Sequence, residues 1–169
     1  MTYLFRLSVF CVLLLPSSDN AQINTNFSST EFEIYLLKDA LLTTTQAMKV
    51  PLDRLELVSK PFLSARDIKL YHWSTHEFDL HKRGDSVFQK MSVESYKSAG
   101  VPFVVVVGKQ RIYLGAFWWP FSSSIPPVTY ITMSTPHPFL SPCPICRRPD
   151  LRSDQRIHDS LYQAGVLVD

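Results

Sequence analysis

The sequence predicts an α+β fold: a small mixed or antiparallel sheet of about four to five strands with one main helix packed on it. The run VPFVVVV at residues 101–107 is apolar at both alternating positions, which is typical of a strand buried on both faces. Asp85 or Ser86 can cap a helix that Gly100 ends, because glycine often stops helices in the left-handed conformation. Eight of the twelve prolines lie within residues 120–149, so we expect a Pro-rich C-terminal wrap and then a short terminal helix.

The segments before this helix have the patterns of strands. Residues 32–38 alternate in the way that predicts a first strand, and residues 55–62 predict a second strand or an extended segment. Ser64 and Asp67 are spaced as the cap and the closing residue of a single turn. Alternation then continues through residues 68–80, which we interpret as one long strand.

The segments after residues 101–107 predict a hairpin and a short C-terminal helix. Residues 108–110 form a tight turn, and residues 111–118 return as a strand. A short strand is expected at residues 128–133. Residues 153–164 predict a helix that Gly165 ends, with three side chains facing inward, namely Ile157, Leu161 and Ala164. The last residues are expected to dock on the domain or to add an edge strand.

The first residues have the pattern of a secretory signal peptide. Arg6 precedes an apolar run, residues 7–15, and a polar segment of small residues follows. The run is too short to span a bilayer, which needs roughly 20 apolar residues. We therefore predict export to the periplasm, the cell envelope or the exterior, with no transmembrane span in the mature chain.

The domain boundaries follow from these patterns. We expect a signal peptide at residues 1–21, a flexible lead-in at 22–31, the α+β domain at 32–133, and a Pro-rich tail at 134–169. The formal net charge is +2, with both signs dispersed along the chain. Such a charge distribution gives no footprint for nucleic acid, so we expect the partner to be a protein or peptide instead.

The order of these elements resembles a known family. The segment PFLSARDI, residues 61–68, is followed by a β-rich stretch, a helix, a small hydrophobic strand, a hairpin and a loop rich in serine and proline. This order is similar to the periplasmic head subdomain of the SecD protein-translocation component, which also occurs in stand-alone exported proteins. The resemblance covers about residues 32–133 and implies an α+β fold that contacts proteins or preproteins and is no enzyme. Two features depart from the family. This chain lacks the membrane helices that surround the SecD head, and its Pro-rich tail has no counterpart in the family's pattern.

Cys143 and Cys146 form a C-x-x-C pair, which can make a local disulfide, a redox pair or half of a metal site. Zinc needs four ligands, and a second C-x-x-C pair is missing. His137 and His158 could complete a Cys2His2 set, although their spacing matches no standard zinc module. We favour a local disulfide and no cofactor, with zinc as the alternative.

His72 and His76 lie on one face of the strand predicted at residues 68–80. Two residues four apart on a strand are separated by roughly 13 Å, too far to share a metal ion. We therefore interpret both as surface histidines or as histidines with hydrogen-bond partners inside the protein.

An aromatic cluster follows the returning strand of the hairpin. The alternation sends Phe117 and Trp119 to one face and Trp118 to the other, and Phe121 follows them. Exposed aromatic side chains beside proline and serine are typical of binding surfaces, and Tyr113 could extend this one. The alternative is that the aromatic residues cap the core beneath the Pro-rich tail.

No catalytic constellation is visible in the sequence. Residues 122–124 are serines, but the G-x-S-x-G elbow of serine hydrolases is missing, and the carboxylates are scattered. We therefore expect an exported, non-catalytic interaction module that contacts a protein or peptide through the aromatic loop. An extracytoplasmic metal-binding protein is the alternative, and a hydrolase using one of the serines is a third possibility.

Overall fold

The computed structural model describes residues 30–94, 99–133, 137–147 and 149–169. The predicted signal peptide therefore lies outside the described residues, as does most of the predicted lead-in. Within the described ranges, no helix is both long and apolar enough to cross a membrane.

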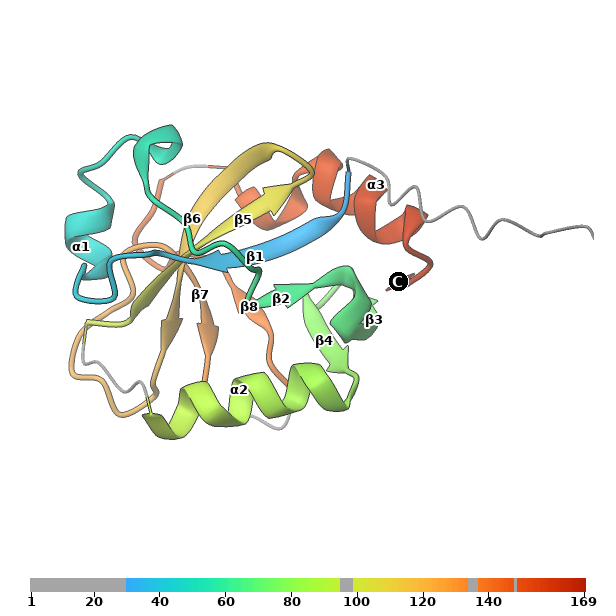
Figure 1. The fold of residues 1–169 in the computed structure, drawn as a ribbon, viewed down its shortest axis with the longest axis horizontal. Helices are drawn as coiled ribbons and strands as arrows, with labels where there is room; N and C mark the ends of the chain where they lie inside the picture. Colours follow the sequence, from blue (N-terminus) through green and yellow to red (C-terminus); the bar gives the residue numbers. More distant parts are fainter. Residues whose placement is uncertain (1–29, 95–98, 134–136, 148) are drawn as a thin grey trace, which may run out of the picture.

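The fold is α+β, as predicted, with a curled six-stranded sheet and a second sheet of three strands (Figure 1). In sheet order the first sheet contains β2 (Leu63–Ser64), β1 (Phe32–Leu36), β5 (Val101–Val107), β6 (Gln110–Trp118), β7 (Thr129–Thr132) and β8 (Leu140–Ser141). Its pairs are antiparallel except β6 with β7, which is parallel. The second sheet contains β4 (Glu77–Leu80), β3 (Ile68–His72) and β9 (Leu167–Val168). The prediction of four to five strands was therefore too low.

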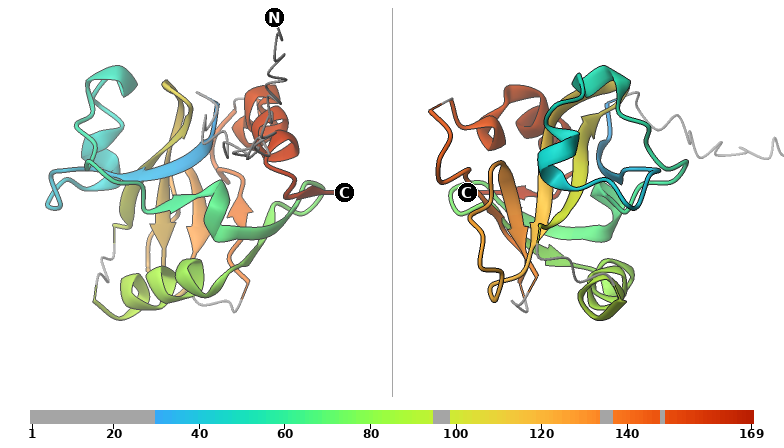
Figure 2. Two further views of the ribbon diagram at one scale, coloured as in Figure 1. Left: turned by 45° about the vertical axis from the view of Figure 1, so that its right-hand side comes forward. Right: turned by 90° about the vertical axis from the view of Figure 1, so that its left-hand side faces the viewer.

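In the part of the chain that the structure describes, three α-helices lie on different sides of the curled sheet (Figure 2). They are α1 (Thr44–Ala47), α2 (Lys82–Glu94) and α3 (Gln155–Gln163). Three short 3-10 helices connect other elements, namely η1 (Leu52–Arg54), η2 (Ala65–Asp67) and η3 (Leu151–Ser153). The main predicted helix corresponds to α2, and the predicted terminal helix corresponds to α3.

Strand β5 is buried on both faces, as its composition predicts. On one face, Phe103 and Val105 belong to the main core, which also takes side chains from α2 and α3. On the other face, Val104 and Val106 pack against a smaller cluster beneath α1 and η1. The central strand therefore requires a covering layer on each side of the sheet.

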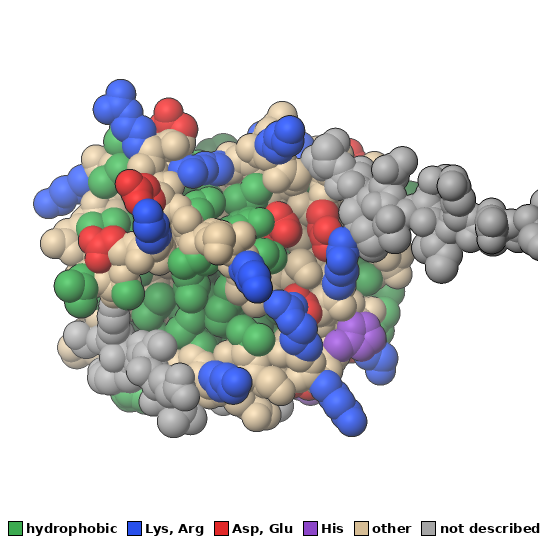
Figure 3. Space-filling model, in the orientation of Figure 1, with side chains coloured by type: hydrophobic (Ala, Val, Ile, Leu, Met, Phe, Trp, Pro, Cys, Tyr) green, Lys and Arg blue, Asp and Glu red, His purple; other side chains and the backbone are tan. Residues whose placement is uncertain are grey.

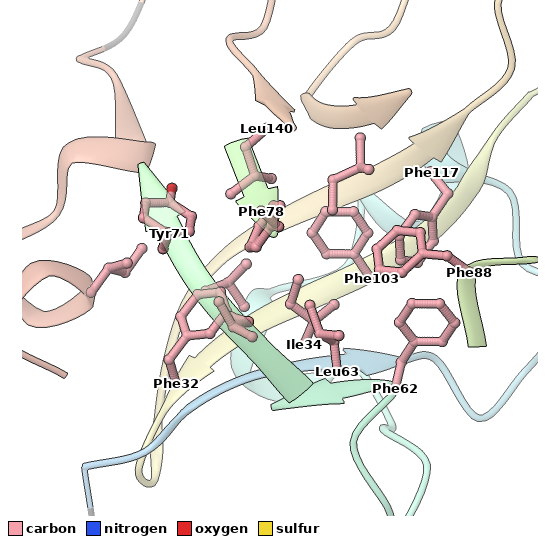
Figure 4. Close-up of a cluster of buried hydrophobic side chains, with 14 of the residues drawn as sticks. Phe32, Ile34, Phe62, Leu63, Tyr71, Phe78, Phe88, Phe103, Phe117 and Leu140 are labelled. Carbon is pink, nitrogen blue, oxygen red and sulfur yellow. The ribbon is translucent and has the colours of Figure 1, made fainter. Parts of the chain in front are cut away.

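Aromatic rings fill the main core (Figure 4). The ring of Phe117 lies 4.8 Å from that of Phe103, 4.8 Å from that of Phe62 and 5.8 Å from that of Phe88, measured between centroids. These rings come from two central strands, from the segment before β2 and from α2. On the face drawn in Figure 3, hydrophobic side chains gather between β1 and α2, and charged groups of both signs surround them.

Residues 68–80 form a hairpin and not the single long strand expected from their alternation. Strand β3 ends at His72, and β4 begins at Glu77 and returns antiparallel to it. His76 closes the turn with a φ of 58°, and its backbone N–H donates to the carbonyl of His72 at 2.7 Å. Because the chain reverses, Phe78 lies opposite Tyr71 on the buried face.

Helix α2 begins at Lys82, before the predicted caps Asp85 and Ser86. Its predicted end falls among residues 95–98, which lie outside the described residues. Gly100 has a φ of +71°, so its predicted left-handed conformation is confirmed. The turn predicted from Ser64 and Asp67 is also confirmed, as the capping box of η2.

Residues 55–62 were predicted to form either a strand or an extended segment, and the structure shows the extended segment. A single bridge joins Leu57 to Leu37, and the regular pairing with β1 begins only at β2. The backbone N–H of Phe62 donates to the carbonyl of Ile34 at 2.8 Å, which holds this segment along the edge of β1.

Helix α3 buries Ile157 and Leu161, as predicted, whereas Ala164 is exposed and does not face inward. Gly165 follows the helix with a φ of +71°. Strand β9 then pairs in parallel with β3, which is the predicted addition of an edge strand.

Two glycines with the same φ allow a matched test of packing around Trp118. A Cβ on Gly100 would lie 2.5 Å from the Trp118 ring, whereas a Cβ on Gly165 would meet nothing within 4 Å. We expect Gly165→Ala to cost about 1 kcal/mol, because an L residue is strained at this φ. Gly100→Ala should cost a further 1–3 kcal/mol, roughly, because the added methyl group overpacks the interior. Urea unfolding of the two variants measures the difference, and equal losses would contradict the close contact with Trp118.

Candidate binding surface

The structure places four of the five predicted binding residues in the interior. Tyr113, Phe117, Trp118 and Trp119 are all buried, and only Phe121 is exposed. The prediction that this cluster presents an aromatic contact surface is therefore wrong for those four residues. They cap the core, which was the alternative interpretation.

The predicted alternation of the aromatic residues is confirmed. Phe117 and Trp119 belong to the main core, and Trp118 packs on the other face of β6 against Ala116 and Val128. Both faces are covered, so neither offers a patch of exposed rings. On the second face, Trp118 is covered by Val128 and by the loop at residues 120–127, where the carbonyl of Ser124 accepts from its indole.

The loop at residues 120–127 is held in place from beneath by Trp118. The indole Nε1–H of Trp118 donates to the carbonyl of Ser124 at 3.2 Å. The backbone N–H of Ser122 donates to the carbonyl of Trp119 at 3.0 Å, which forms a turn at the start of the loop. The hydroxyl oxygens of Ser122 and Ser124 are 3.1 Å apart and share a hydrogen bond. The serines therefore have a structural role in shaping the loop.

A second segment, whose turn is closed by a disulfide, lies against the end of this loop. Cys143 and Cys146 form a disulfide across the turn that contains Pro144 and Ile145. The Sγ atom of Cys146 lies 3.5 Å from the carbonyl oxygen of Pro127. The disulfide therefore fixes the shape of the turn at the point where it meets the loop.

Large apolar side chains project from both braced segments. Phe121 is 69% exposed and Ile125 is 63% exposed on the loop, and Ile145 is 60% exposed on the turn. We call these three residues the apolar loop surface. Ile125 and Ile145 were not predicted from the sequence. The signal that could have found them is an isolated isoleucine within a segment rich in proline and serine or in proline and cysteine.

The residues proposed for a Cys2His2 metal site are not brought together. Both cysteines are in the disulfide, and His158 packs edge-on against Trp73 with ring centroids 5.0 Å apart. His137 lies beside Asp79, with Nδ1 3.4 Å from a carboxylate oxygen. Among the described residues, no group of three or more His, Cys, Asp or Glu side chains could hold a metal ion.

The two histidines singled out in the sequence have different environments. His72 is half-buried, and its Nε2 lies 3.5 Å from the Asp79 carboxylate. His76 is buried, and its Nδ1 lies 2.8 Å from the hydroxyl oxygen of Tyr71. Burial of the ring, together with the positive charge of Arg152, lowers the pKa of His76 to about 4. The neutral imidazole of His76 and the Tyr71 hydroxyl share this hydrogen bond, and the tautomer of His76 decides which of the two donates.

Arg152 holds this buried network against the six-stranded sheet. Its guanidinium donates to the carbonyl of Leu140 at 2.8 Å and also pairs with the Asp150 carboxylate. The hydrogen bond from Arg152 holds the pKa of Asp150 below its usual range. Tyr113 lies within the electrostatic reach of the same groups, and its burial raises its pKa.

Comparisons with protein-family models, with curated proteins and with solved structures found no significant match. The resemblance to the SecD head subdomain is not tested by them and stays a prediction.

The low pKa of His76 predicts a loss of stability in mildly acidic solution. The unfolded chain binds this proton near pH 6.5, whereas the folded protein binds it only near pH 4. The free energy of unfolding should therefore fall as the pH drops from 6.5 to 4, by on the order of 3 kcal/mol.

The control for this prediction is His76→Asn, because asparagine tolerates the left-handed conformation and does not titrate. Urea unfolding at pH 7, 5.5 and 4 gives the free energy of unfolding of both proteins. The effects of carboxylates that both proteins contain cancel when one free energy is subtracted from the other. The gap between the two free energies should change with pH. A gap that stays constant between pH 7 and pH 4 would contradict the low pKa.

Proposed function

We propose that this chain is an extracytoplasmic interaction module that binds a protein or peptide through the apolar loop surface. The observation that carries the proposal is the exposure of Phe121, Ile125 and Ile145 on two segments, the loop held by the hydrogen bond from Trp118 and the turn closed by the disulfide. Side chains of this size and exposure on a fixed backbone are suited to insertion into a partner's pockets.

The bracing supports binding because it reduces the entropic cost of association. A flexible loop must be ordered when it binds, which subtracts from the affinity. Here the hydrogen bond from Trp118 to Ser124 and the Cys143–Cys146 disulfide order the two segments in the free protein. The contacts that the apolar side chains make with a partner then contribute to the affinity without a large loss for ordering the backbone.

Two features support a location outside the cytoplasm. The leader at residues 1–21 has the pattern of a signal peptide, and disulfides persist in oxidising compartments. The family resemblance implies the same kind of role, a contact with a protein or preprotein. A partner presenting an apolar surface or an extended apolar segment fits the chemistry of the three residues.

The test uses the double variant Phe121→Ser/Ile125→Ser, since replacing the buried tryptophans would damage the core. The chain from Gln22 onward is immobilised, and a displayed peptide library and an envelope extract are passed over it. Binding of each retained peptide or protein is then repeated with purified components. We expect the double variant to bind at least about 30-fold more weakly, as for the loss of one or two interface hot spots.

The matched control is Leu41→Ser, which removes an exposed apolar side chain near α1 and far from the loop in sequence. Circular dichroism and urea unfolding establish that both variants are folded. Retention of the same partner at equal affinity by wild type and double variant would contradict the proposal. Equal weakening by the Leu41 variant would point to nonspecific apolar adhesion and would contradict it as well.

A further inference from the structure

The Cys143–Cys146 disulfide closes a small ring at the surface of the molecule. Only Pro144 and Ile145 lie between the two cysteines. A disulfide stabilises a folded chain mainly by restricting the unfolded chain, and this effect grows with the length of the loop that the bond closes. Neither cysteine belongs to a hydrophobic cluster of the core. The fold therefore gains little stability from this bond, and stability alone does not account for it.

The segment that carries the ring is anchored at both ends by other contacts. On one side, β8 pairs with β7 in the six-stranded sheet. On the other side, the guanidinium of Arg152 donates to the carbonyl of Leu140 at 2.8 Å. This hydrogen bond joins the start of the segment to its end without using either sulfur atom. Opening of the disulfide therefore leaves the strands and α3 in place.

The ring is open to a reactant from solution. Cys146 is exposed, whereas Cys143 is partly buried. Pro144, Ile145 and Arg147 are exposed as well, so the turn projects from the surface. In thiol–disulfide exchange a thiolate must reach one of the two sulfur atoms, and exposed disulfides are the labile ones. Cys146 is therefore the residue at which an incoming thiolate has the better access.

The surroundings of Cys146 suit both the attack and its product. Arg147 follows Cys146 directly, and a cation beside a disulfide attracts an anionic thiolate and stabilises the thiolate that leaves. The carbonyl oxygen of Pro127 lies 3.5 Å from the Sγ atom of Cys146. A carbonyl oxygen can accept a weak hydrogen bond from a protonated thiol. The reduced form of Cys146 thus has a hydrogen-bond acceptor within reach in the same backbone conformation.

We propose that Cys143 and Cys146 form a thiol–disulfide exchange site whose substrate is a dithiol of another protein or peptide. In the first step, a thiolate of the substrate attacks the Sγ atom of Cys146. A mixed disulfide forms, the bond between the two cysteines breaks, and Cys143 leaves as a thiolate that takes up a proton.

In the second step, the other thiolate of the substrate attacks the substrate sulfur of the mixed disulfide. Cys146 leaves as a thiolate and is protonated in turn. The substrate dithiol has then lost two electrons and two protons and has become a disulfide. The disulfide of this chain has gained them and has become two thiols, so the exchange balances without a further reactant.

The proposal does not rest on the apolar loop surface. Exchange takes place at the sulfur atoms and is measured with small thiols, which do not need Phe121 or Ile125. Failure of exchange would therefore leave peptide binding untouched, and failure of peptide binding would leave exchange untouched.

The first test is reduction of the oxidised, folded chain from Gln22 onward by millimolar reduced glutathione without denaturant. Free thiols are alkylated with N-ethylmaleimide and counted by mass spectrometry, and circular dichroism follows the fold. We expect most chains to carry two alkyl groups and to stay folded, whereas structural disulfides resist reduction by glutathione. The proposal is overturned if the disulfide stays intact or if its reduction unfolds the chain.

The second test identifies the sulfur that is attacked. Cys143→Ser leaves the thiol of Cys146, and Cys146→Ser leaves the thiol of Cys143. Each variant is mixed with oxidised glutathione, and mass spectrometry follows the mixed disulfide over time. We expect Cys146 to form it about 10-fold faster, because access to the sulfur limits the rate. Equal rates, or a faster reaction at Cys143, would overturn the assignment of Cys146.

The third test concerns the neighbouring charge, with Arg147→Gln as the variant and Lys109→Gln as its matched control. Lys109 is an exposed cation in the turn between β5 and β6. Reduction by dithiothreitol, which is uncharged before it ionises, should slow roughly 2- to 5-fold in the Arg147 variant, the effect of one exposed charge pair. The Lys109 variant should react as fast as the wild type. Equal slowing in both variants, or slowing in neither, would contradict the role of Arg147.

Discussion

The two-sided burial of β5 is the constraint on which the rest of the structure depends. A strand with apolar side chains at both parities is stable only when each face of the sheet is covered. The main core covers one face with rings from β1, β3, β4 and α2 and with aliphatic side chains from α3, and the segment around α1 and η1 covers the other. The second sheet and the C-terminal helix therefore belong to the same core as the central hairpin and are not accessories to it.

Features set by local chemistry could be predicted from the sequence, and features set by long-range pairing could not. The β5–β6 hairpin, the η2 turn and the left-handed Gly100 each depend on a few neighbouring residues, and all three were correctly predicted. The β3–β4 turn was missed because residues 73–76 contain no glycine, proline, asparagine or aspartate to mark it. Alternation also continues unbroken through it, and His76 itself adopts the positive φ.

The binding surface could be predicted only in part, for a related reason. Phe121 was named correctly, but the burial of Trp118 depends on Val128 and on the loop at residues 120–127, which pack against that face of β6. Periodicity assigns a side chain to a face and says nothing about what will cover it. The position of His137 beside Asp79 likewise depends on a register between segments more than fifty residues apart, which no local pattern contains.

The parallel pairing of β9 with β3 has a consequence for the order of folding. The two strands are joined by the β4–α2 segment, the whole central hairpin and the Pro-rich region, so their contact is among the most distant in the sequence. Such contacts form late, because a large loop must close before they contribute any stability. During synthesis, β3 and β4 form an open-edged hairpin until α3 and β9 emerge. In that interval the unpaired edge of β3 is open to pairing with another chain, which is the hazard that chaperones suppress.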